Sequence, residues 1–107
     1  MAVVVEDYDD IDADGATASD RDAIARCLNN AGEDDLVAYV PRWLADEKDI
    51  DTVIAEPIEY SSEKAHLVEI HDRDVWLPKS VITRFVARER VGIPQRGLAE
   101  FAGGGQA

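Results

Sequence analysis

The fold is decided by residues 64–80, which read KAHLVEIHDRDVWLPKS. Apolar and polar residues alternate on both sides of a short polar segment, and this period-two pattern is typical of paired strands. We predict a β-hairpin with strands over 64–71 and 74–77 and a turn at Asp72-Arg73. Pro78 cannot donate a backbone hydrogen bond, so the second strand is expected to end there.

The turn position sets the pairing within this hairpin. It places Ile70 opposite Val75 and Val68 opposite Leu77 on one face. The other face then carries Trp76, so both faces hold apolar residues. We therefore expect the hairpin to be covered on both sides, at least in part.

Two shorter strand patterns precede the hairpin, over 52–55 and 58–61. Pro57 lies between them and breaks a strand ladder, so we expect an edge strand or two short pieces. With the hairpin they form a small antiparallel β-meander.

Two helices are expected before the meander. The first spans 20–30, with Ser19 as a possible N-cap, and its apolar positions are Ile24, Cys27, Leu28 and Ala31. The second is favoured as one helix over 34–47 that kinks at Pro41; the alternative is a new helix over 41–48. Its apolar positions are Leu36, Val37, Val40, Trp43 and Leu44.

A final helix is expected after the hairpin, beginning at Ser80 and ending at Gly92. Its apolar positions are Val81, Ile82, Phe85 and Val86. The predicted fold class is therefore α+β, with two N-terminal helices, a small antiparallel β-meander and a C-terminal helix. We divide the chain into an acidic N-terminal arm (1–18), one domain (19–101) and a flexible tail (102–107).

The charge of the chain is strongly acidic and unevenly distributed. The 107 residues contain 23 acidic and 11 basic side chains, for a net charge of −12. Residues 1–72 hold 20 of the acids and 5 of the bases, whereas residues 73–97 hold 6 bases and 2 acids. DNA, RNA and anionic lipid should be repelled by the acidic part. Salt adaptation without any specific partner is an alternative explanation of this composition.

Seven carboxylates form the candidate partner-binding face: Glu33, Asp34, Asp35, Asp46, Glu47, Asp49 and Asp51. Carboxylates on a rigid helix can imitate the phosphates of a nucleic acid and occupy a basic channel. We therefore expect a non-enzymatic inhibitor of a basic host protein that handles nucleic acid, of the anti-CRISPR or DNA-mimic type. The alternative is a nucleic-acid accessory module that uses a basic face made of Lys79, Arg84 and Arg88.

Other chemistry has little support in the sequence. Asp10, Asp12 and Asp14 open a calcium-loop pattern, but Arg21 stands where the closing glutamate belongs, so we expect no metal and no cofactor. His66 and His71, five residues apart on a strand, face opposite sides and are expected to be structural. No set of residues suggests an enzyme.

The hairpin segment also resembles small uncharacterised proteins of phages and plasmids, which share the pattern K-A-x-L-V…V-W-L-P-K-S before a helix. The similarity covers about 20 residues and includes Lys79 and Ser80. It implies a protein of a mobile element that acts in the cytoplasm of the host cell. No run of residues is apolar and long enough for a membrane span.

Overall fold

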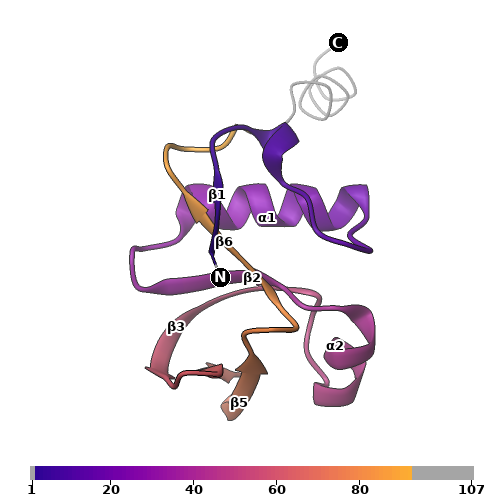
Figure 1. The fold of residues 1–107 in the computed structure, drawn as a ribbon, viewed down its shortest axis with the longest axis vertical. Coiled ribbons are helices and arrows are strands. Elements are labelled where there is room, and N and C mark those ends of the chain that lie inside the picture. Colours follow the sequence, from indigo (N-terminus) through magenta and orange to yellow (C-terminus); the bar gives the residue numbers. More distant parts are fainter. Residues whose placement is uncertain (1, 93–107) are drawn as a thin grey trace, which may run out of the picture.

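The computed structural model describes residues 2–92, which form a six-stranded mixed sheet with two α-helices (Figure 1). The strand order is β1-β6-β2-β3-β4-β5; β1 and β6 are parallel and the other neighbours are antiparallel. The elements are β1 (Ala2–Val5), a 3-10 turn η1 (Tyr8–Asp10), α1 (Ala18–Asn30), β2 (Asp35–Tyr39), α2 (Arg42–Lys48), β3 (Val53–Ser61), β4 (Ala65–Ile70), β5 (Arg73–Pro78) and β6 (Thr83–Ala87).

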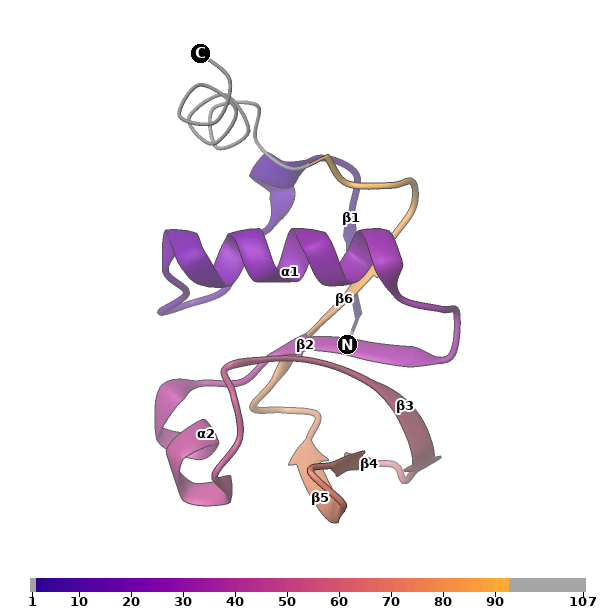
Figure 2. The same cartoon turned by 180° about the vertical axis from the view of Figure 1, so that it is seen from behind.

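The sheet has a hydrophobic core on each face. The α2-side core contains Leu36, Ala38, Val40, Leu44, Ala45, Ile54, Val68, Ile70, Val75, Leu77 and Ile82. The α1-side core contains Val5, Ile11, Ala13, Ile24, Ala25, Val37, Tyr39, Phe85 and Val91. Successive residues of β2 belong alternately to the two cores, as strand geometry requires. Figures 1 and 2 show the two helices on opposite sides of β2.

The kinked helix predicted over 34–47 is wrong. Residues Asp35–Tyr39 form the central strand β2, and Pro41 is the N-cap of the short helix α2. A continuous helix would require a hydrogen bond that Pro41 cannot donate, whereas a strand buried on both faces suits the apolar run before it. The alternative helix over 41–48 is closer to the structure. Trp43, expected in the core, is 61% exposed.

The predicted C-terminal helix is also wrong, and with it the helix–meander–helix arrangement. The backbone N–H groups of Val81 and Ile82 donate to Pro78 in a turn, and Thr83–Ala87 then form strand β6. This strand fills the position between β1 and β2, where only an extended segment can satisfy the backbone groups of both neighbours. The predicted tail 102–107 lies outside the described residues.

The hairpin is confirmed, with a turn one residue earlier than predicted. His71 and Asp72 form the turn, and both have positive φ angles, 54° and 64°. Val68 therefore pairs with Val75, and Leu67 with Trp76. The register differs from the predicted one by two residues, so each side chain stays on its expected face.

The two segments expected around Pro57 form one long strand. β3 pairs with β2 through its first half and with β4 through its second half. The register with β4 shifts between Ile58 and Tyr60, where the strand is irregular. Such an irregularity bends a strand, and β3 is strongly curved in Figure 2. It is a central strand, not an edge strand.

The first helix is confirmed over most of its predicted length. Its N-cap is Thr17 rather than Ser19: the Thr17 hydroxyl accepts from the Asp20 backbone, and the Asp20 carboxylate accepts from the Thr17 backbone. This reciprocal pair satisfies two backbone donors that the helix leaves open. In the preceding segment, β1 joins the sheet and Ile11 is buried.

Candidate functional site

The seven carboxylates of the predicted acidic face fall into two groups. Residues 33–35 lie in the loop before β2 and at its start, whereas Asp46, Glu47, Asp49 and Asp51 lie in α2 or just after it. Figures 1 and 2 show that loop and α2 at opposite ends of β2. The structure therefore does not bring these carboxylates together on one surface.

A different surface combines exposed aromatic rings with carboxylates. Tyr60 pairs with Leu67 across β3 and β4, and Leu67 pairs with Trp76 across β4 and β5. Because side chains alternate along a strand, this row points away from the α2-side core, which contains Val68. Tyr60 is 59% exposed and Trp76 is 45% exposed. The two rings meet edge to face, with centroids 6.1 Å apart.

Three carboxylates lie beside this row. Glu69 and Asp74 are directly paired in the register of β4 and β5. A hydrogen bond with Asp74 raises the pKa of Glu59, and the desolvation of Glu59 and the charges of Asp74 and Glu69 raise it further. Like charges on opposed strand positions repel each other. We call these six residues the acidic aromatic face: Glu59, Tyr60, Leu67, Glu69, Asp74 and Trp76.

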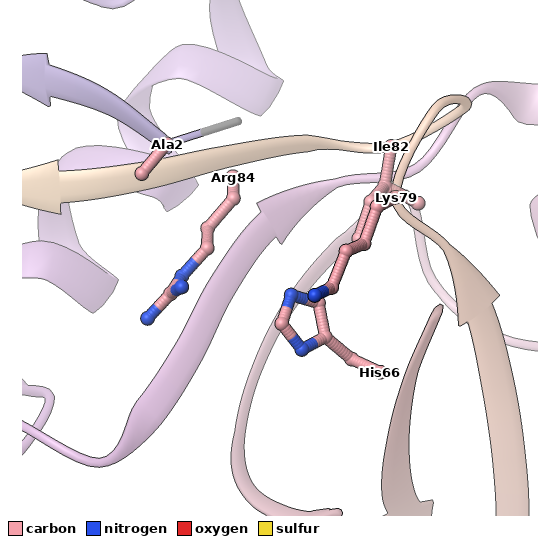
Figure 3. Close-up of a pocket in the computed structure, with 5 residues that line it drawn as sticks. All are labelled: Ala2, His66, Lys79, Ile82 and Arg84. Atoms are coloured by element: carbon pink, nitrogen blue, oxygen red, sulfur yellow. The ribbon is translucent and has the colours of Figure 1, made fainter. Parts of the chain in front are cut away.

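A pocket of about 110 Å³ lies on the other side of the sheet (Figure 3). His66, Lys79 and Arg84 line it together with Ala2 and Ile82. His66 lies two residues before Val68 in β4, so its side chain is on the face of the α2-side core. Arg84 pairs with Ala38, a residue of that core, and therefore lies on the same face. The pocket is therefore an opening at the end of this core.

The electrostatics of this pocket are cationic. His66 is only 5% exposed, and its Nδ1 lies 2.7 Å from the hydroxyl oxygen of Ser61. Burial lowers the pKa of His66, and the charges of Lys79 and Arg84 lower it further. The Nε of Arg84 is buried and has no hydrogen-bond partner among the described residues. Within residues 2–92, neither Lys79 nor Arg84 forms an ion pair.

The predicted basic face is therefore only partly assembled. Lys79 and Arg84 line the same pocket, whereas Arg88 follows β6 and pairs with Glu6 at 3.4 Å, with both side chains exposed. His66 was not predicted to belong to this group. Its alternation with Val68 marked it as facing the core, but the pairing of β6 with β2 is what brings Arg84 to the same side.

The other candidate residues are the three aspartates of the calcium-loop pattern and Cys27. The Asp10 carboxylate accepts from the backbone N–H groups of Glu6 and Asp7, which fixes the turn η1. Across the part of the chain that the structure describes, no three His, Cys, Asp or Glu side chains, including Asp12 and Asp14, cluster to hold a metal ion. Burial raises the pKa of the Cys27 thiol, which disfavours the reactive thiolate.

In comparisons with protein-family models, with curated proteins and with solved structures, no match was found. None of the helices in residues 2–92 is long and apolar enough to cross a membrane.

Proposed function

We propose that this protein is a non-enzymatic interaction protein that binds and blocks a basic protein that handles nucleic acid. Its contact surface is the acidic aromatic face. The observation that carries the proposal is the exposure of Tyr60 and Trp76 beside three carboxylates on a rigid sheet. In the mobile-element setting implied by the resemblance of the hairpin, the partner is a host protein, as for anti-CRISPR or DNA-mimic inhibitors.

The chemistry of this face favours a cationic side chain of the partner. The face of an exposed Trp or Tyr ring attracts Lys or Arg by about 0.5–1 kcal/mol, and more when water is excluded. Carboxylates add charge-assisted hydrogen bonds to the same group. A hydrogen bond with Asp74 is the largest cause of the raised pKa of Glu59, and desolvation and repulsion by the charges of Asp74 and Glu69 add to it. A bound cation would relieve this repulsion.

The overall charge supports a partner that normally binds nucleic acid. Such proteins carry Lys and Arg side chains that neutralise phosphates. A domain with a net charge of −12 complements that surface electrostatically and competes with the nucleic acid for it. Tyr and Trp are also the residues most enriched among the anchors of protein interfaces.

The first experiment measures binding of a fluorescent Lys- and Arg-rich peptide. The triple variant Glu59→Gln, Glu69→Gln and Asp74→Asn removes three charges from the acidic aromatic face. A matched control, Glu33→Gln, Asp34→Asn and Glu47→Gln, removes three charges elsewhere. We expect at least about tenfold weaker binding for the first variant and at most about a twofold change for the control. Equal losses would mean that only net charge matters.

The second experiment tests blocking. A basic DNA-binding protein is mixed with duplex DNA in a gel shift at low salt, and the acidic protein is added. We expect release of the DNA and no shift by the acidic protein alone. Tight binding of duplex DNA by the acidic protein itself would contradict the proposal.

A further inference from the structure

We propose that the pocket between His66, Lys79 and Arg84 binds a small phosphate-type oxyanion, either free phosphate or the phosphate group of a nucleotide. The three side chains come from β4, from the loop between β5 and β6, and from β6. Figure 3 shows the Lys79 side chain extending toward the His66 ring, whereas the Arg84 guanidinium lies apart from these two groups; all three side chains line the same pocket. Separate parts of the chain therefore converge on one opening.

The charge of the pocket contrasts with the rest of the molecule. Acidic residues outnumber basic ones by about two to one along the chain, yet two permanent cations line this pocket without an ion pair in residues 2–92. The buried Nε of Arg84 is a donor that has no acceptor among these residues. Buried donors are nearly always paired, so the unpaired Nε leaves the Arg84 guanidinium without an internal acceptor at this atom.

The size and donor set fit a tetrahedral anion. A volume of about 110 Å³ leaves room for more than one water molecule. Arg84 and Lys79 supply charge-assisted donors. When the Ser61 hydroxyl donates to Nδ1 of His66, the ring proton lies on Nε2, which becomes a third donor.

The surroundings of the pocket favour a small anion over a nucleic-acid polymer. A polymer would place many further phosphates against a protein of net charge −12, and each would be repelled. A single phosphate can enter the pocket alone. Arg88 lies outside the pocket and is paired with Glu6, which makes it a matched control for Arg84.

The experiment titrates the full-length, 15N-labelled protein with sodium phosphate while sodium chloride keeps the ionic strength constant. Side-chain signals of Arg84 and His66 are followed by NMR. We expect saturable shifts in the millimolar range, binding weakened at least about tenfold by Arg84→Gln, and binding within about twofold of wild type for Arg88→Gln. Lys79→Gln serves as a second pocket variant if Arg84→Gln does not fold.

Absence of saturation, or an equal loss in Arg88→Gln, would overturn the proposal. Adenosine 5′-monophosphate and adenosine are compared with phosphate to identify the source of the anion. Tighter binding of the nucleotide than of phosphate assigns the pocket to a nucleotide, and equal binding assigns it to free phosphate. Adenosine should not shift the Arg84 signal; if it binds as well as the nucleotide, the phosphate group is not what the pocket recognises.

Discussion

The ring of Trp76 meets the ring of Tyr60 edge to face, at an interplanar angle of 84°, on the surface of the sheet. Such a pair contributes about 0.5–1.5 kcal/mol beyond burial. The contact holds two large exposed side chains in one arrangement before any partner arrives. Side chains that are already ordered lose less conformational entropy on binding, so the pair is a pre-organised anchor.

The first prediction concerns Trp76 as that anchor. Trp76→Ala removes the ring and should weaken binding of a Lys- and Arg-rich peptide at least about tenfold, as expected of an interface anchor. Trp43→Ala removes a ring that is more exposed than Trp76 but lies in α2, and should change the affinity at most about twofold. Fluorescence anisotropy of a labelled peptide measures both. Equal losses for the two variants would show that neither ring is specific.

The second prediction concerns the hairpin turn. Both His71 and Asp72 adopt positive φ angles, which glycine tolerates without the Cβ clash. Asp72→Gly should therefore stabilise the fold by about 0.5–1 kcal/mol, because glycine is the preferred second residue of a hairpin turn in which both central residues have positive φ. Urea denaturation measures the change, with Asp72→Ala as the comparison that should stabilise less or destabilise. A loss of stability in Asp72→Gly would contradict the strain assigned to this turn.

The hairpin and α1 could be predicted because their signals are local. The alternation around residues 64–78 and the apolar spacing of Ile24, Cys27 and Leu28 each describe one element. β2 and β6 were mistaken for helices because their apolar residues also match a helical spacing. Both strands are central, and their burial depends on partners distant in sequence: β6 pairs with β1 from the other end of the described chain. A short apolar run does not distinguish a buried strand from a buried helix.

The candidate site could also be predicted only in part, because its residues come from different strands. The sequence predicted an acidic face on one helix over 34–47, whereas the structure divides that segment between β2 and α2. Glu59, Glu69 and Asp74 come from three strands, and only the bend of β3 and the register of β4 with β5 place them together. Lys79 and Arg84 were predicted to share a face, and they line one pocket for a different reason, the return of β6 beside β2.

The third prediction concerns His66 and pH. Burial and the neighbouring charges of Lys79 and Arg84 lower its pKa below the ordinary value of 6.5. Between the folded and unfolded pKa values the unfolded chain binds more protons, so stability falls as the pH drops below about 6.5 and is fully present above it. Urea denaturation between about pH 7.5 and about pH 5.5 should show this loss.

Two variants isolate the contribution of His66. His66→Gln should reduce the pH dependence, because the titrating group is gone. His71→Asn is the matched control, because it removes the other histidine, which lies in the exposed hairpin turn. A slope in His66→Gln identical to that of the wild type would assign the pH dependence to other groups.

The last prediction uses salt to separate two explanations of the acidity. A net charge of −12 on 107 residues causes self-repulsion, which salt screens over about 10 Å at 0.1 M and about 3 Å at 1 M.

If the acidity is salt adaptation, the protein should be poorly folded at 0.1 M salt, and its binding should persist at 1 M. If the acidic aromatic face is a binding surface, the fold should hold at 0.1 M while peptide affinity collapses toward 1 M. We expect the second outcome, because a hydrophobic core on each face of the sheet stabilises the fold without requiring the charges to be screened. Circular dichroism melts and peptide titrations at both salt concentrations decide between the two, and an unfolded chain at 0.1 M would refute the binding explanation.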